Sequence, residues 1–136
     1  MIKSIVFDFN GVILNGDTGG VDHEMMDLIR DLYDLEFNLY IFSNTSRSTI
    51  QLVDSKYDFL KYFDGVILAE EHGHSKPSNE AFEHLLSVIN GLGGEIVYID
   101  DGRDNLRQAE KYGMTALLFI DADRLRISLA SLDTLD

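Results

Sequence analysis

Carboxylate side chains follow two aliphatic runs of the sequence, at the point where each run ends. Asp8 closes the run IVFD and is followed two residues later by Asn10, and Asp100 and Asp101 close the run IVYIDD. A carboxylate at the tip of a buried strand is costly unless a cation or a proton offsets its charge. Two or three carboxylates, with water and substrate supplying the remaining oxygens, are typical of Mg²⁺ sites. These residues therefore indicate a magnesium site.

Groups suited to an anionic ligand follow two other runs. NLYIFS ends at Ser43 and is followed by Asn44, and Lys76 lies in the loop after the third run. Each residue alone has an ordinary explanation, because short polar residues at strand ends commonly form turns or cap helices. Together, three carboxylates, a hydroxyl and a lysine are expected on one rim of the fold.

Two alternating periodicities determine where that rim lies. Short runs rich in aliphatic, β-branched and aromatic residues predict buried strands; they cover residues 3–9, 38–43, 65–69, 95–100 and 115–120. Apolar residues three and four apart predict helices between them; these cover residues 22–35, 78–91 and 103–112, with one helix and a short second one in 46–62 and a last helix in 121–134. Ser78 and Gly113 suit the start and end of two of these helices.

This alternation predicts an α/β fold with a parallel sheet covered on both faces. In such sheets ligands lie beyond the carboxyl ends of the strands. The polar residues identified above all follow those ends.

Composition limits the classes of partner. The chain has 136 residues, which predicts a single domain spanning residues 1–136. Its net charge of −13 argues against nucleic acid and anionic membranes as partners. Without cysteine it has neither disulfides nor thiolate metal sites, which fits a cytoplasmic location. Its apolar start is too short for a signal peptide, and no run reaches the length of a membrane helix.

The four polar segments, in order, resemble the four motifs of the haloacid dehalogenase superfamily of Rossmann-like hydrolases. IVFDFNGVIL (5–14) resembles the first, hhhhDxDGxhh, where h is apolar, and LYIFSN (39–44) resembles the second. SKPS (75–78) resembles the third, and IVYIDDGRDN (96–105) resembles the fourth. The resemblance spans residues 3–119. It implies a Rossmann-like three-layer sandwich with a mainly parallel five-stranded sheet.

The resemblance implies a role for each carboxylate. Asp8 would be the nucleophile that forms an aspartyl-phosphate. Asp101 would be the principal Mg²⁺ ligand, with Asp8, Asp100 and the main-chain carbonyl of Asn10 beside it. Asn105 stands where the family often has Asp, so a weaker, indirect metal role is implied.

The resemblance also implies which residues bind the substrate. Ser43, Asn44 and Lys76 would hold the phosphoryl oxygens, and Lys76 would also offset the charge of Asp8. A carboxylate cannot attack an anionic phosphate unless cations neutralise both, and Mg²⁺ with a lysine supplies that charge.

Asn10 departs from the family pattern. Phosphatases of the family usually have Asp there, as general acid toward the leaving group and then as base toward water. Asparagine has no titratable proton, and general acid–base catalysis is worth roughly 10²–10⁴-fold in rate. We therefore expect slow phosphoester hydrolysis, with two alternatives: a catalytically impaired binding or regulatory domain, and a dehalogenase. The Asp100–Asp101 pair disfavours the dehalogenase, which needs no metal carboxylates.

The intervals between the first three motifs are too short for a cap domain. An uncapped rim is open to a phosphorylated small molecule or macromolecule, and the resemblance allows a homo-oligomer whose neighbouring subunit acts as a lid. NGDTGG (15–20) is either a local flap or a flexible connector.

Two further groups have open interpretations. His72 and His74 form either a transition-metal pair or a solvated loop, and the loop is preferred because no other His or Cys completes a motif nearby. The tyrosines follow helix or strand faces and are expected to serve packing; they are Tyr33, Tyr40, Tyr57, Tyr62, Tyr98 and Tyr112.

Overall fold

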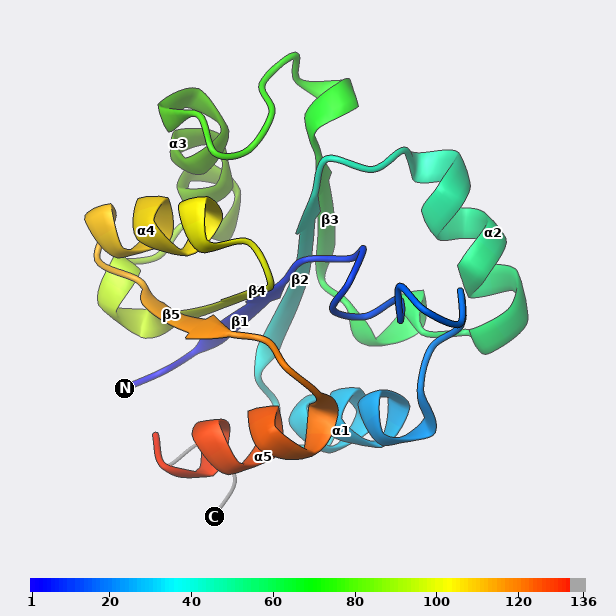
Figure 1. The fold of residues 1–136 in the computed structure, drawn as a ribbon. Helices are drawn as coiled ribbons and strands as arrows, with labels where there is room; N and C mark the ends of the chain where they lie inside the picture. The colour runs from blue at the N-terminus through cyan, green and yellow to red at the C-terminus, as the bar shows by residue number, and fades with distance from the viewer. Residues whose placement is uncertain (133–136) are drawn as a thin grey trace.

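The computed structural model describes residues 1–132 and contains a five-stranded sheet (Figure 1). The strands are β1 (Ser4–Phe7), β2 (Asn38–Ser43), β3 (Gly65–Leu68), β4 (Ile96–Asp100) and β5 (Thr115–Leu118). Their order is β3-β2-β1-β4-β5, and every neighbouring pair is parallel. β1 therefore lies at the centre, between β2 and β4, so that the ends of these three strands are adjacent.

Helices cover both faces of the sheet (Figure 1). The helices are α1 (His23–Asp34), α2 (Arg47–Tyr57), α3 (Asn79–Ile89), α4 (Arg103–Lys111) and α5 (Ala122–Ala130). Apolar residues of α1, α2 and α5 pack in the core on one face, and those of α3 and α4 pack on the other. The predicted Rossmann-like three-layer α/β sandwich is confirmed.

The central strand shows why the sheet is buried on both sides. Ile5 and Phe7 contribute to the core under α1, whereas Val6 contributes to the core under α3 and α4. All three are 0% exposed, because successive side chains of a strand point to opposite faces. Burying each side chain of this size contributes roughly 1.5–3 kcal/mol. This core fixes the strand ends from which the polar residues project.

The helix boundaries agree closely with the sequence patterns. The stretch 46–62 forms α2 and a short 3₁₀ helix, Leu60–Tyr62, as expected. Ser78 caps α3 by accepting a hydrogen bond from the Ala81 amide at 3.2 Å, and Gly113 follows α4 with a φ of +83°. The predicted last helix corresponds to α5, whereas residues 133 and 134 of that prediction lie outside the described residues. The 3₁₀ helices Ala69–Glu71 and Gly93–Glu95 were not predicted.

The connections near the site are short. Within residues 1–132, the segment between β1 and β2 holds α1, and the segment between β2 and β3 holds α2 and one 3₁₀ helix. Neither segment contains a cap-sized insertion. In the same part of the chain, no helix combines the length and the apolar character needed to cross a membrane.

Candidate functional site

Residues at the carboxyl ends of β1 and β2 border one cavity of about 220 Å³. It is lined by Asp8, Asn10, Ser43, Asn44, Thr45, Lys76 and Asn105. The first two follow β1, the next three end or follow β2, and Lys76 lies in the loop before α3. All of these residues except Thr45 were singled out for chemistry by the sequence, and they border one space because parallel strands bring their carboxyl ends together.

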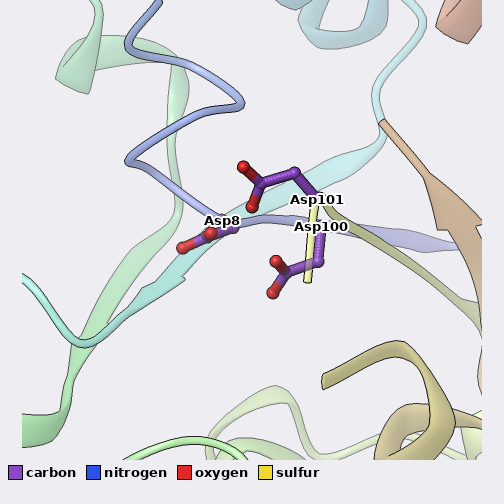
Figure 2. Close-up of side chains that lie close together, drawn as sticks. All are labelled: Asp8, Asp100 and Asp101. Carbon is purple, nitrogen blue, oxygen red and sulfur yellow. The ribbon is translucent and has the colours of Figure 1, made fainter. Parts of the chain in front are cut away.

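Three carboxylates converge beside this cavity (Figure 2). Asp8, Asp100 and Asp101 each offer an oxygen, and these oxygens all lie within 4.8 Å of one another. Asp8 is 8% exposed and Asp100 is 0% exposed, whereas Asp101 is exposed at the rim. Such a cluster of hard oxygen donors, open on one side, fits Mg²⁺ with water and substrate in its remaining positions.

Lys76 supplies the positive charge of the cluster. Its ammonium lies 3.2 Å from Asp8 Oδ1 and 2.9 Å from Asp100 Oδ2, and its side chain is only 2% exposed. The ammonium also donates to the Phe42 carbonyl at 2.9 Å. Three acceptors thus hold one buried cation in place between Asp8 and Asp100.

Both oxygens of Asp100 are occupied by donors from the protein. Oδ2 accepts hydrogen bonds from Lys76, from the Tyr98 hydroxyl and from the Asn105 amide. Oδ1 accepts from the Gly102 amide at 2.9 Å. Asp100 is therefore less available to a metal than Asp8 or Asp101, and its main contact toward the cavity is Lys76.

The electrostatics of the cluster differ between its members. Burial, together with the negative charge of Asp100, raises the pKa of Asp8 to about 6, although Lys76 and the Phe9 amide oppose the change. Burial alone would raise the pKa of Asp100, but the Lys76 charge and hydrogen bonds from Tyr98, Lys76 and Gly102 lower it below its usual value.

The rim carboxylate behaves like Asp8. Burial and the neighbouring charge of Asp100 raise the pKa of Asp101. Two of the three carboxyl groups thus hold their protons more tightly than free aspartate does, which is the expected response of buried carboxylates that lie close to one another.

Asn44 uses its side chain to join the loops that follow β2 and precede α3. Its amide nitrogen donates to the Lys76 carbonyl at 3.2 Å, and its oxygen accepts from the Lys76 amide at 2.8 Å. Ser43 Oγ accepts from the Thr45 amide at 3.2 Å. The side chain of Asn44 thus holds the backbone of Lys76. Asn44 also lines the cavity.

The turn after Asp8 depends on Gly11. This glycine has a φ of +83°, and a Cβ atom built on it would lie 2.2 Å from Asp101 Oδ2. A side chain at position 11 would therefore be both strained and in collision with the rim carboxylate.

The segment 15–20 is a hydrogen-bonded loop. Asn15 Oδ1 accepts from the Asp17 amide at 2.9 Å, and Asn15 Nδ2 reaches Asp22 at 3.1 Å, next to the start of α1. This loop borders a second cavity of about 320 Å³ that also includes Asp101. The cavity has an apolar side formed by Val12, Phe119 and Ile120.

The expected solvated histidine loop is exposed at His74 and only half-exposed at His72. The ring of His72 packs against that of His84 at a centroid distance of 3.8 Å, and its Nε2 is buried without a hydrogen-bond partner within residues 1–132. His84 lies on α3, too far along the sequence for the His72–His74 spacing to indicate it.

Tyr98 is the site residue that sequence reasoning assigned only to packing. It is 0% exposed, and its hydroxyl donates to Asp100. Burial and the charge of Asp100 raise the pKa of Tyr98 well above its usual range, so the hydroxyl keeps the proton that it donates. Its position two residues before Asp100 on one strand was the available signal, because such residues share a face.

Comparison with known proteins supports the family resemblance, and the matched residues begin after the first motif. The family model of haloacid dehalogenase-like hydrolases matches residues 17–113. A sesquiterpene phosphatase from Aspergillus oryzae is 29% identical over 102 residues, which are 74% of this chain and 52% of the relative. The chain thus spans about half the length of that curated relative.

Solved structures share the fold. An uncharacterized protein from Corynebacterium glutamicum superposes with a TM-score of 0.78 at 22% identity, covering 100% of this chain and 98% of its own. A haloacid dehalogenase family enzyme from Bacteroides thetaiotaomicron, in complex with magnesium and inorganic phosphate, has a TM-score of 0.79 at 16% identity, covering 92% of this chain and 99% of its own.

Proposed function

Because this chain belongs to the haloacid dehalogenase-like hydrolases, we propose that it hydrolyses phosphate esters in a Mg²⁺-dependent reaction through an aspartyl-phosphate on Asp8. The observation that carries the proposal is the buried contact between Lys76 and Asp8, at 3.2 Å, on the wall of a cavity at the carboxyl end of the sheet. This contact places a carboxylate and a cation beside a space that could hold a phosphate, which supports the proposal.

Asp8 attacks phosphorus with its carboxylate, and the bond from phosphorus to the leaving oxygen breaks. Lys76 stabilises the negative charge that develops on the phosphoryl oxygens, because a fixed ammonium in a site sheltered from water acts strongly on nearby charge. Ser43, Asn44 and Thr45 border the same cavity, and Ser43 completes the binding of those oxygens. Water then attacks the acyl phosphate and regenerates the free carboxylate of Asp8.

Asp8, Asp101 and the main-chain carbonyl of Asn10 would hold Mg²⁺, and Asp100 supports them through Lys76. The metal, when bound, supplies positive charge that neutralises the phosphate and orients its oxygens. The raised pKa values of Asp8 and Asp101, caused by burial and by the charge of Asp100, fit this assignment, since a bound cation would favour the ionised form of both carboxyl groups.

Asn10 sets the limit on turnover. It lies exposed on the cavity wall, where it can donate or accept a hydrogen bond but cannot transfer a proton. Esters with good leaving groups need little protonation and should react fastest, whereas alkyl esters and the acyl phosphate should react slowly.

The substrate class follows from the open rim and from one relative. The cavity is bordered by no cap within residues 1–132, so both small and macromolecular phosphates have access. The similarity to a sesquiterpene phosphatase and the apolar side of the neighbouring cavity make phosphates of apolar alcohols the first candidates.

The test is a screen of an aryl phosphate, alkyl phosphates and an isoprenoid monophosphate, with Mg²⁺ and with EDTA. Hydrolysis should require Mg²⁺ and should be lost in Asp8→Asn, while Asp34→Asn, an exposed change away from the site, should leave the rate unchanged. Equal rates in EDTA, or full activity of Asp8→Asn, would refute the proposal. Mg²⁺-dependent phosphate binding without turnover would instead support the binding or regulatory alternative that Asn10 suggests.

A further inference from the structure

The Lys76 ammonium lies in a binding seat, defined by the aromatic rings of Phe42 and Tyr98 together with its hydrogen-bond acceptors. Its Nζ is 5.0 Å from the centroid of the Phe42 ring and 5.4 Å from that of Tyr98. Both rings are buried, at 2% and 0% exposure. Aromatic faces attract a cation, most strongly where water is excluded. The ammonium thus contacts two aromatic rings as well as two carboxylates.

Tyr98 acts on this lysine twice. Its ring forms part of the seat, and its hydroxyl donates to Oδ2 of Asp100, the same oxygen that accepts from Lys76 at 2.9 Å. A hydrogen-bond donor to that oxygen offsets part of its negative charge and so weakens its attraction for the Lys76 ammonium. The hydroxyl therefore influences the relative strength of the two ion pairs that Lys76 forms with Asp100 and with Asp8.

We propose that Tyr98 is a positioning residue for phosphoryl transfer, which holds Lys76 against Asp8 through Asp100. The inference rests on the proposed function, because it assigns Lys76 to the reaction. The Tyr98 hydroxyl makes its contact below the cavity and does not line it. Its effect should consequently appear in the chemical step more than in substrate binding.

Tyr98→Phe removes the hydroxyl and keeps the ring, so the fold should be retained. Among residues 1–132, Lys76 and Asn105 are then the donors left to Asp100 Oδ2, which draws the ammonium away from Asp8. Loss of an outer hydrogen-bond partner beside a metal site typically costs about 10–100-fold in metal affinity or activity. We expect kcat for an aryl phosphate to fall by about 10-fold or more, with KM within about twofold of the parent.

The matched control is Tyr112→Phe. It removes another tyrosine hydroxyl that donates to a carboxylate, Glu83 at 3.1 Å, on the exposed surface. This control should change neither kcat nor KM. Circular dichroism and thermal melting of both variants verify that each is folded.

Crystal structures of the parent and of Tyr98→Phe give a readout that needs no substrate. We expect the separation of Lys76 Nζ and Asp8 Oδ1 to lengthen beyond hydrogen-bonding distance in the variant. An unchanged separation overturns the proposal, whether or not kcat falls, and so does a kcat within twofold of the parent. If the parent hydrolyses no phosphate ester, the proposed function fails, and the structural comparison alone decides whether Tyr98 positions Lys76.

Discussion

Replacing Asp8 with asparagine should stabilise the folded chain near neutral pH while removing its proposed nucleophile. Burial and the charge of Asp100 raise the pKa of Asp8 from 3.8 to about 6 in the folded chain. The folded state therefore binds this proton more tightly than the unfolded state, and stability is lost as the pH rises from about 4 through about 6. Asparagine resembles the protonated carboxyl in size. Its side-chain oxygen can accept the hydrogen bond that the Phe9 amide donates to Asp8 at 2.8 Å in the parent.

The size of the effect follows from the two pKa values. Each pKa unit corresponds to about 1.4 kcal/mol, so ionised Asp8 costs about 3 kcal/mol of stability at pH 7 and about 0.5 kcal/mol at pH 4. Urea unfolding of parent and Asp8→Asn in EDTA, at both pH values, measures the difference directly. We expect the variant to be more stable by about 3 kcal/mol at pH 7 and nearly equal to the parent at pH 4.

The control for this experiment is Asp34→Asn, which changes an exposed carboxylate and should alter the free energy of unfolding by less than about 0.5 kcal/mol at either pH. An Asp8→Asn variant that is no more stable than the parent at pH 7 would refute the reasoning. Lys76 would then compensate the charge of Asp8 fully, and the raised pKa would be incorrect.

Three further changes test neighbouring parts of the site. Asn10→Asp should restore a proton donor and raise turnover of alkyl phosphates by roughly 10²-fold or more, measured by phosphate release; an unchanged rate in a folded, Mg²⁺-binding variant would contradict the missing-acid explanation. Mg²⁺ at 100 times its Kd should stabilise the parent by about 2.7 kcal/mol, and Asp101→Ala should lose this gain in thermal melting; an equal gain in both would place the metal elsewhere. Gly11→Ala should cost about 1–3 kcal/mol in urea unfolding because of its positive φ, and an unaltered free energy would contradict the tight contact with Asp101.

The sequence predicted the strands and helices because their signals are local. Alternation of short apolar runs with helical periodicity determines the class of fold, and parallel strands bring their carboxyl ends to one edge. Asp8, Ser43 and Lys76, which are far apart in the sequence, could therefore be expected at one cavity before any coordinates were known. The resemblance to a known family added chemical roles to those positions, and these remain proposals.

What the sequence could not predict are pairings between distant side chains. The amide of Asn44 is engaged with the backbone of Lys76, and His72 packs on His84. Neither pairing leaves a periodic signal, because it depends on how two loops or a loop and a helix approach one another. Tyr98 is an intermediate case: its burial followed from the strand pattern, whereas its hydrogen bond to Asp100 required the rotamers of both side chains.

The energetics of the cluster bear on whether the site is used. Buried ionic groups are often replaceable by apolar side chains without loss of stability, and the raised pKa of Asp8 indicates that its charge opposes folding at neutral pH. Packing alone gives no reason to place a carboxylate there. Asp100 differs, because its donors lower its pKa, and a structural role explains it. Asp8 is therefore the carboxylate whose presence requires a functional explanation. If its replacement stabilises the fold and also abolishes Mg²⁺-dependent hydrolysis, the energetic cost of Asp8 is explained by the reaction that requires it.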